Sequence, residues 1–532
     1  MKSSSSSLFF LYFLLCLSGG FSGSSDHKTG AFVKEVCKAT EYFSTCEETI
    51  SSSNPQNTTD VLLAAIDVSA VSVCTVLKKI TAIRSASEDN FNRTKASDTC
   101  LELLRQSTRR LRMAGVAIPR SEIDDSIAWT SAALIYQNDC FGRLSKVNGS
   151  SMVDDAMKFL NGTANITSNA LSLISSFRRF GDVTSRWIPP QTERDGYWGK
   201  GDSGSGSGIS HTTFTSPGKP KQNPDVRVCK DEENGDCFRT VQEAVDSAPD
   251  SLSGSERFVI YIMAGFYEET VVVPVTKWNL FFVGDGMGKT VITGSMNTQM
   301  VGLSTYDTAT VAVNGDGFMA KDLTFQNTAG PTKHQAVAFR SDSDHSVLEN
   351  VEFLGHQDTL YTHSLRQYYK SCRIAGTVDF IFGNAAVVFD NCSILIRPRQ
   401  SSPERGETNT VTAQGRTDPA QSTGFVFQNC TVNGTDEYVF LYRENPGKHR
   451  NYLGRPWKKY SRTVFLNCRL EEIVEARGWL AWDGDFALST LFYGEFRSSG
   501  PSANPGRRVS WSTQIPKDHV IAYTVNNFIQ GI

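Results

Sequence analysis

Two aspartates that sit among apolar residues are the side chains of this sequence best suited to carry out chemistry. Asp379 lies inside the apolar run of residues 376–384, and Asp358 precedes it by 21 residues. A carboxylate with Val, Phe and Ile as neighbours loses hydration, so it needs a partner charge to stay ionised. Arg455 can supply that charge, because a guanidinium holds a carboxylate through two hydrogen bonds. A lone aspartate in such an ion pair is as compatible with a structural role as with catalysis.

The spacing of the neighbouring polar residues favours catalysis. A separation of 21 residues is about one turn of a β-solenoid, which would place Asp358 and Asp379 side by side on adjacent coils. Gln357 directly precedes Asp358, and Gln335 lies 23 residues before Asp358, one coil further along the same face. Two neighbouring carboxylates can act as nucleophile and acid, and glutamine amides can donate hydrogen bonds to an oxyanion.

Three other possible sites lack the spacing that their chemistry requires. Residues 284–290 look like a phosphate-binding loop, but Val283 stands where a P-loop needs glycine. His356 and His363 are not accompanied by Cys or carboxylates at metal-ligand spacing, so we predict no metal site. The sequence contains no Gly-x-Ser-x-Gly elbow, which leaves a serine hydrolase of that type without a nucleophile.

The second half of the chain carries a strand-rich repeat that would position these residues. Phe389, Phe427 and Phe465 each open a Phe-x-Asn-Cys block, and the blocks are spaced 38 residues apart. Stacked coils of a parallel β-solenoid require apolar residues that face inward and polar residues at the turns. A β-sandwich with accidental spacing is the alternative, but the Asn-Gly and Asp-Gly turns of sandwiches are sparse. We therefore predict one elongated all-β domain at residues 225–532.

The first half is predicted to be an all-α domain. Apolar residues within residues 30–182, such as Val61, Ala65 and Val73, recur at helical spacing along single stripes. Several such stripes with short connections predict an antiparallel helical bundle. Residues 183–224 are rich in Gly, Ser, Pro and Lys, and are predicted to be a flexible linker.

The N-terminus indicates a secreted protein. Residues 1–24 combine Lys2 with an apolar run that is shorter than the roughly 20 residues of a membrane span, which predicts a signal peptide and a soluble mature protein. Of the 12 cysteines, 11 remain once Cys16 leaves with the signal, so at least one stays outside any intrachain disulfide. A net charge of -3 argues against a polybasic nucleic-acid binder. Possible N-glycosylation sites are Asn57, Asn92, Asn148, Asn161, Asn165, Asn391, Asn429 and Asn433.

The ordered motifs of the second half resemble those of plant pectin methylesterases. The matching segments are residues 327–330, 355–361, 376–384, 412–416, 453–457 and 493–495. The resemblance runs from about Val226 to the C-terminus. It implies a right-handed parallel β-helix in the plant cell wall that hydrolyses the methyl esters of homogalacturonan. It implies a monomer that needs neither a metal nor an organic cofactor, and neither a nucleic-acid nor a membrane partner.

The same resemblance implies roles for individual residues. Asp379 would be the nucleophile, and Asp358 would protonate the departing methanol and then activate water. Gln357, together with Gln335, would stabilise the oxyanion of the transition state. Arg455 would keep Asp379 ionised and aligned. Substrate contacts are implied at Thr305, Gln335, Arg455 and Trp457, and stacking on sugar rings at Phe380 and Trp482.

The first half resembles the plant pectin methylesterase and invertase inhibitors, which are four-helix bundles with a helical N-terminal hairpin. The residues that match are Cys37, Cys46, residues 98–103 and residues 129–134, which lead to Cys140. The likeness implies disulfides Cys37–Cys46 and Cys100–Cys140, with Cys74 outside them. It further implies a pro-region that restrains the esterase until a subtilase removes it, and separate pectinesterase inhibitor proteins as partners.

Some residues depart from these family patterns. The dibasic pair Arg178-Arg179 near the junction is followed by Phe180 instead of the usual two leucines. His356 stands where a tyrosine is usual, and Ala476 where a proline is usual. Cys229 and Cys237 flank an acidic insert and are predicted to form an additional disulfide near the first coil.

Two other functions stay open from the sequence. The chain could be another β-helix pectinase, such as a lyase or a polygalacturonase. It could also be a non-catalytic protein that binds pectin or inhibits a pectinesterase or an invertase. The adjacent Gln357-Asp358 pair and the apolar setting of Asp379 favour the ester reaction over both.

Overall fold

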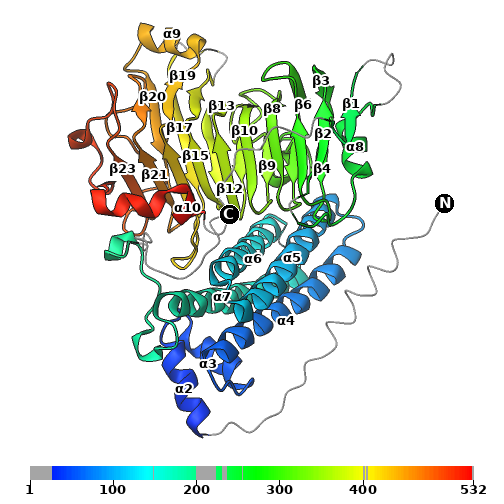
Figure 1. Ribbon diagram of the computed structural model, residues 1–532, viewed down its shortest axis with the longest axis vertical. Coiled ribbons are helices and arrows are strands. Elements are labelled where there is room, and N and C mark those ends of the chain that lie inside the picture. The colour runs from blue at the N-terminus through cyan, green and yellow to red at the C-terminus, as the bar shows by residue number, and fades with distance from the viewer. Residues whose placement is uncertain are drawn as a thin grey trace, which may run out of the picture. The chain divides into compact units, whose positions relative to one another are not determined.

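The computed structural model describes residues 27–147, 149–198, 223–230, 237–254, 256–399, 402 and 405–529. The predicted signal peptide of residues 1–24 lies outside these ranges, as do residues 199–222 of the predicted linker. The chain divides into two compact units between Pro190 and Gln191. The first unit is helical and the second is built of parallel strands (Figure 1).

Four long helices form the bundle of the first unit. Helix α5 packs against α4 and α6, and α7 packs against the same two helices, which closes the ring. The N-terminus of α4 is capped by the side chain of Asn57 and that of α5 by Asn90, each accepting a hydrogen bond from a backbone N–H of the first turn. The predicted helical bundle is confirmed. The helices are α2 (His27–Cys37), α3 (Phe43–Ser51), α4 (Thr58–Ser85), α5 (Phe91–Ala117), η1 (Ile118–Arg120), α6 (Ile123–Leu144), α7 (Ser151–Phe180) and η2 (Thr184–Arg186).

The helical unit contains the two disulfides that the resemblance to the inhibitor family implied. Cys37–Cys46 joins α2 to α3, which form the hairpin before the bundle, and Cys100–Cys140 joins α5 to α6. Such links stabilise a fold chiefly by restricting the unfolded chain. Cys74 is not part of a disulfide. Helix α4 is the one described helix that is long and apolar enough to cross a membrane, but much of it is buried in the bundle.

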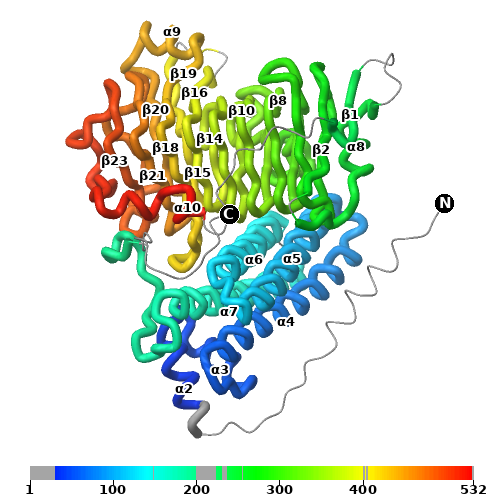
Figure 2. Tube along the Cα trace, viewed as in Figure 1, coloured from blue at the N-terminus to red at the C-terminus, as the bar shows by residue number. Residues whose placement is uncertain are grey.

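The second unit is a parallel β-helix whose strands form three ladders. Every strand pairing among its described residues is parallel, which excludes the β-sandwich alternative. Successive coils follow one another in chain order along the axis of this unit (Figure 2). The long strands β8 and β10 take part in two ladders at once.

We number the ladders as faces. Face 1 comprises β1 (Val226–Val228), β2 (Phe258–Ile262), β5 (Leu280–Val283), β8 (Met319–Asn327), β10 (Ser346–Leu354), β12 (Arg366–Lys370), β15 (Ala386–Asp390), β18 (Gly424–Gln428), β21 (Arg462–Leu466), β23 (Phe492–Phe496) and β24 (Thr513–Gln514). Face 2 comprises β3 (Gly265–Glu268), β6 (Thr290–Gly294), β8, β10, β13 (Arg373–Gly376), β16 (Ser393–Ile396), β19 (Thr431–Gly434) and β22 (Arg469–Leu470). Face 3 comprises β4 (Val271–Val273), β7 (Val311–Val313), β9 (Phe339–Ser341), β11 (Leu360–Thr362), β14 (Val378–Gly383), β17 (Glu407–Gln414) and β20 (His449–Gly454).

The 38-residue repeat is one coil of the helix. Phe389 pairs in register with Phe427, and Phe427 with Phe465, and their buried rings stack at 4.6 and 4.5 Å between centroids. The asparagines that follow, Asn391 and Asn429, both have φ of 54°, the left-handed conformation that asparagine tolerates at turns. The predicted solenoid and its asparagine turns are therefore confirmed.

A column of cysteines runs beside the stacked phenylalanines. Cys372, Cys392, Cys430 and Cys468 are buried and are not in disulfides. Burial raises the pKa of the Cys392, Cys430 and Cys468 thiols well above the usual value, so these groups stay protonated and unreactive. They behave as small apolar core residues.

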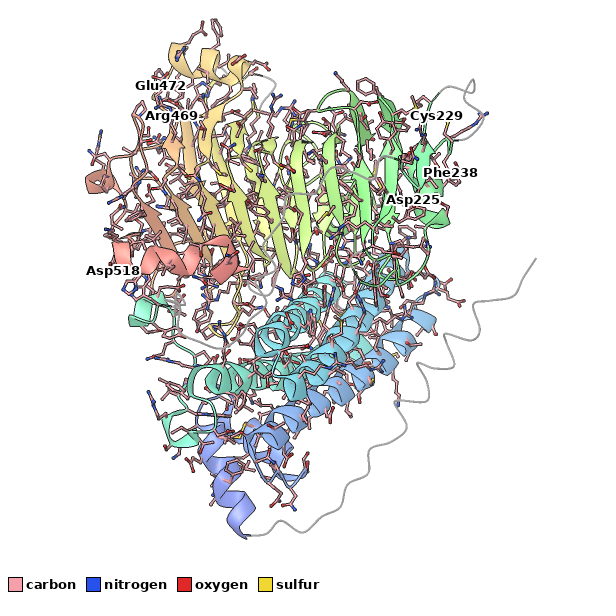
Figure 3. The ribbon with its side chains drawn as sticks, viewed as in Figure 1. Asp225, Cys229, Phe238, Arg469, Glu472 and Asp518 are labelled. Atoms are coloured by element: carbon pink, nitrogen blue, oxygen red, sulfur yellow. A yellow bond between two sulfur atoms is a disulfide. The ribbon has the colours of Figure 1, made fainter. Side chains whose placement is uncertain are left out.

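A helix closes the first coil of the β-helix, and the C-terminal segment covers the outer side of face 1. The first coil is closed by α8 (Val241–Ser247), which buries Val241, Ala244 and Val245. The predicted disulfide Cys229–Cys237 is present, and Cys229 also donates its backbone N–H to the carbonyl oxygen of Phe238 (Figure 3). The C-terminal segment lies on the outer side of face 1, where Tyr523, Phe528 and Ile529 join a buried apolar cluster. The remaining short elements are η3 (Glu193–Asp195), η4 (Thr305–Thr308), α9 (Asp436–Glu444), η6 (Pro505–Arg507), η7 (Lys517–Tyr523) and α10 (Val525–Phe528).

The predicted linker of residues 183–224 begins with folded structure. Helix η2 follows α7, and η3 with its capping box Thr192–Asp195 belongs to the second unit. Glycine, serine and proline dominate only the later part of that range. The average composition of residues 183–224 therefore did not indicate that their first part is folded.

Candidate active site

Asp358 and Asp379 lie on neighbouring coils at the start of two adjacent strands of face 3. Leu360 in β11 pairs with Ile381 in β14, and the backbone N–H of Asp358 donates to the carbonyl oxygen of Val378 at 3.1 Å. Both aspartates are buried. The spacing of 21 residues is thus one coil, as the sequence predicted.

Both aspartates hold a backbone conformation that is unusual for residues other than glycine. Their φ angles are 64° for Asp358 and 52° for Asp379, in the left-handed region. The pairing of β14 with β17 also shifts its register between Val378 and Ile381, so Asp379 sits at a bulge. Strained backbone of this kind gathers at functional sites, where the surrounding fold maintains it.

Arg455 holds the carboxylate of Asp379 from the second coil beyond it. Its Nε and Nη2 donate to Oδ1 and Oδ2 of Asp379 at 2.9 and 2.6 Å, which is the two-pronged geometry expected of a guanidinium and a carboxylate. The side chain of Asp379 is only 8 % exposed, so its carboxylate is shielded from solvent, whereas Arg455 is 24 % exposed. The predicted Asp379–Arg455 partnership is present.

Thr410 adds a contact to Asp379 that the sequence did not reveal. Its hydroxyl donates to Oδ1 of Asp379 at 2.6 Å and accepts from the backbone N–H of Asp379 at 3.0 Å. Thr410 lies in β17, 31 residues along the chain, and only the pairing of β14 with β17 brings it there. The nearest sequence signal was its place in a strand-like stretch before the matching residues 412–416.

The surroundings of Asp358 favour its protonated form. Burial and the neighbouring charge of Asp379 raise the pKa of Asp358 well above its usual value, and Arg455 offsets this only in part. Asp358 therefore keeps a proton that an exposed aspartate would lose. One carboxylate fixed by an arginine beside another that retains its proton is the division of roles expected for a nucleophile and an acid.

Both predicted glutamines lie beside the aspartates. The backbone N–H of Ala336 donates to the carbonyl oxygen of Gln357 at 3.2 Å, so Gln335 and Gln357 lie on adjacent coils. Oε1 of Gln335 accepts a hydrogen bond from the hydroxyl of Thr298 at 2.8 Å. The amide nitrogen of Gln335 therefore points away from Thr298. The Gln357 side chain is half-buried and has no hydrogen-bond partner among the described residues.

Aromatic rings line face 3 beside this cluster. Tyr361 and Phe382 stack at 4.1 Å, and Phe382 meets the ring of Trp457 edge-on at 6.1 Å. The ring of Trp482 is partly exposed and lies 4.3 Å from the guanidinium carbon of Arg455. Phe380 is fully buried in the interior, so the stacking role implied for it is wrong; the bulge turns Phe382 outward instead.

Thr305 lies in the short helix η4, which is capped by Ser304 and Asp307. The neighbouring Tyr306 ring lies over the guanidinium of Arg340 at 3.5 Å and against the ring of His363. No side-chain hydrogen bond joins Thr305 to the other described residues, Asp358 and Asp379 included. Its role as a substrate contact stays a prediction.

The two histidines are engaged in different ways. His363 pairs with the buried carboxylate of Asp342. His356 lies beside Gly355, and burial together with the charge of Arg397 lowers the pKa of His356 to about 4. Among the described residues no group of three or more His, Cys, Asp or Glu side chains is arranged to hold a metal ion.

Comparisons with known proteins match both units. The family model described as pectinesterase matches residues 225–532, and the model described as plant invertase/pectin methylesterase inhibitor matches residues 31–173. "Probable pectinesterase/pectinesterase inhibitor 64" of Arabidopsis thaliana is 51% identical over 94% of this chain and 84% of its own length. "Pectinesterase 2" of Citrus sinensis is 39% identical over 82% of this chain and 79% of its own. A solved pectin methylesterase from carrot matches with a TM-score of 0.54 and 45% identity, covering 58% of this chain and 94% of that structure.

The chain belongs to the pectinesterase family.

It is accordingly a carboxylic ester hydrolase, in which a helical domain of the inhibitor type precedes the pectinesterase domain. The pectinesterase match begins at residue 225, whereas the compact second unit begins at Gln191. The pectinesterase unit of this chain thus includes residues before the family match.

Proposed function

We propose that the chain hydrolyses methyl esters of homogalacturonan to demethylated pectin and methanol, with Asp379 as nucleophile and Asp358 as proton donor. The observation that carries this proposal is the pair itself. Asp379 is bound by Arg455 through two hydrogen bonds, and beside it Asp358 has a raised pKa and no such partner. The likeness to pectinesterases supplies the substrate class.

In the first step an oxygen of the Asp379 carboxylate attacks the ester carbonyl carbon. The negative charge that develops on the carbonyl oxygen is stabilised by amide N–H groups of Gln357 and Gln335. The bond from the carbonyl carbon to the methoxy oxygen then breaks, and the proton of Asp358 passes to that oxygen to give methanol. The galacturonate carbonyl is left joined to Asp379 as an anhydride.

In the second step water attacks the carbonyl carbon of this anhydride. Asp358, now ionised, accepts the proton of the water, and the Asp379 carboxylate departs. Arg455 orients the Asp379 carboxylate for attack through its two hydrogen bonds and binds it again when it departs in the second step. Binding of the sugar chain is assigned to Thr305, Gln335, Arg455 and Trp457, with Trp482 as a further stacking surface.

Methanol release from methylated pectin by an Asp379→Asn variant tests this proposal. Asparagine keeps the shape but lacks the nucleophilic oxygen, so we expect activity to fall by at least about a thousandfold while pectin binding is retained. Asp518, an exposed aspartate at the C-terminal end of the unit (Figure 3), gives the matched control Asp518→Asn, which should keep full activity. Full activity in Asp379→Asn would refute the assignment.

The same assay separates the alternatives left open by the sequence. A lyase or polygalacturonase would shorten the pectin chains, whereas an esterase releases methanol without shortening them. If the protein were a non-catalytic pectin-binding protein or an inhibitor, even the unsubstituted protein would release no methanol from methylated pectin.

We further propose that the protein is secreted to the plant cell wall after removal of residues 1–24. The basic residue and apolar run at the N-terminus and the disulfides of both units support export to an oxidising compartment. Pectinesterase inhibitor proteins and a processing subtilase are the proposed protein partners.

A further inference from the structure

A short segment that precedes the pectinesterase match is built into the pectinesterase unit. We call residues 192–198 the strap. Arg194 anchors the strap, because its Nε and Nη2 donate to three backbone carbonyl oxygens of the unit's last coils. These are the oxygens of Leu491 at 3.0 Å, Leu488 at 2.7 Å and Trp511 at 3.1 Å. At the other end of the strap, Trp198 stacks on His519 at 4.4 Å and meets Phe492 edge-on at 5.5 Å.

Directly before Arg194 the strap carries a buried carboxylate, that of Glu193. The Glu193 side chain is only 6 % exposed, and its Oε1 accepts from Nη1 of Arg462 at 2.8 Å. Tyr523 donates its hydroxyl to the same oxygen at 3.2 Å, and Oε2 lies 3.9 Å from Nη1 of Arg416. Burial opposes ionisation, but the charges of Arg462 and Arg416 hold the pKa of Glu193 below its usual value.

The two arginines depend on this carboxylate. Arg416 is buried, and burial together with the like charge of Arg462 lowers the pKa of Arg416 to about 9, although Glu193 opposes this. Without the negative charge of Glu193, Arg416 and Arg462 would lie close together in a site that water barely reaches, and Asp418 would offset only part of the charge of Arg416. Removing one member of a buried ion pair is costly because the other charge is left uncompensated.

Arg416 and Arg462 in turn hold the loops that carry Trp457. The backbone N–H groups of both arginines donate to Oε1 of Gln414, at 3.0 and 2.8 Å. The N–H of Tyr460 donates to the carbonyl oxygen of Arg416 at 3.0 Å. Between Gln414 and Arg416 lies Gly415, against which the ring of Trp457 packs so closely that an added Cβ would lie 2.7 Å from Cε3.

We propose that Glu193 is a positioning residue of the pectinesterase reaction, which acts through Arg416 and Arg462 on the placement of Trp457. This inference rests on the proposed function for the role of Trp457 in sugar binding. The proposal means that a residue needed for full activity lies outside residues 225–532, the part of the chain that matches the pectinesterase family. The strap is therefore part of the enzyme and not of the connection between its units.

The experiment compares Glu193→Gln with Glu495→Gln in the full-length chain. Glu495 is a matched control, because its side chain is also buried and accepts from Arg508 at 2.7 and 2.9 Å, in a different part of the same unit. Both changes should lower the unfolding midpoint of the pectinesterase unit by on the order of 5 °C. Only Glu193→Gln should raise KM for methylated pectin, by about three- to tenfold, with kcat and its pH profile unchanged.

Hydrogen exchange supplies a readout that does not need activity. In Glu193→Gln, peptides that contain residues 414–423 and 455–462 should exchange faster than in the unsubstituted chain, whereas in Glu495→Gln they should not. Glu193→Asp, which keeps the charge, should stay closer to the unsubstituted chain in both measurements. Equal KM values and equal exchange in the two glutamine variants would overturn the inference and leave Glu193 a purely structural residue. Absence of methanol release by the unsubstituted chain would instead overturn the proposed function.

Discussion

Replacing Asp358 by asparagine should make the protein more stable at neutral pH while removing its activity. Burial and the charge of Asp379 raise the pKa of Asp358 well above its usual value, whereas in the unfolded chain an aspartate titrates near about 3.9. At pH values between the unfolded and the folded pKa of Asp358, the folded protein keeps a proton that the unfolded chain has released. The free energy of unfolding therefore falls as pH rises through this window.

The size of the effect follows from that proton. The contribution of Asp358 to stability is fully present below about pH 4 and is lost at about 1.4 kcal/mol per pH unit as pH rises toward the folded pKa. Asp358→Asn removes the titration, because asparagine stays neutral as protonated aspartate does. The variant and the unsubstituted chain should have similar stability near about pH 4, and the variant should become progressively more stable than the unsubstituted chain as the pH rises from there.

The assay is denaturant unfolding of both proteins at several pH values between 4 and 6.5, followed by tryptophan fluorescence. Six of the eight tryptophans lie in the pectinesterase unit, so the signal reports that unit. Asp518→Asn, at an exposed aspartate, is the control for the substitution itself. Methanol release by Asp358→Asn should fall by at least about a hundredfold. A variant that is less stable at pH 6, or a difference that does not change with pH, would refute the electrostatic reasoning.

Two further predictions concern the aromatic surface and the N-terminus. Gly415→Ala should raise KM for methylated pectin by about three- to tenfold, because the added Cβ would lie 2.7 Å from Cε3 of Trp457 and must displace the ring. Gly447→Ala, with no heavy atom within 4 Å of its Cβ, should leave KM unchanged, and an unchanged KM in Gly415→Ala would contradict the placement of Trp457. N-terminal sequencing of the exported protein should find no start at Phe180, so the proposed subtilase should cut at another site. The dibasic Arg178-Arg179 lies in the last turn of α7, and Arg178 pairs there with Asp124, so a protease would have to unwind the helix.

The architecture was predictable where a local pattern repeats. The Phe-x-Asn-Cys blocks mark successive coils of 38 residues, because Phe389, Phe427 and Phe465 must each face the same interior. Asp358 and Asp379 lie on a shorter coil of 21 residues, and that separation places them side by side. Glu193 lies in a stretch that was predicted from its composition to be a linker. The sequence did not predict that Glu193 is buried, because the residues that bury it lie far along the chain.

The active site was predictable only in part for the same reason. The sequence identified residues whose neighbours along the chain are unusual for their type, such as Asp379 among apolar residues and Gln357 next to Asp358. Thr410 and Phe382 did not stand out, because a threonine or phenylalanine in a strand is ordinary until its side chain is known to face the site. The bulge between Val378 and Ile381 decides that Phe380 points into the core and Phe382 points outward, and no periodicity shows it.

The sequence by itself determined the two-part organisation, the coil period and the identity of the acidic pair, because these follow from local composition and from spacing along one chain. Only the tertiary structure decided that Thr410 also contacts Asp379, which ring faces the site and where the pectinesterase unit begins. Arg455 is 76 residues from Asp379, and Arg462 is 269 residues from Glu193. Charge and burial act through space, so partnerships over such separations exist only once the coils have stacked.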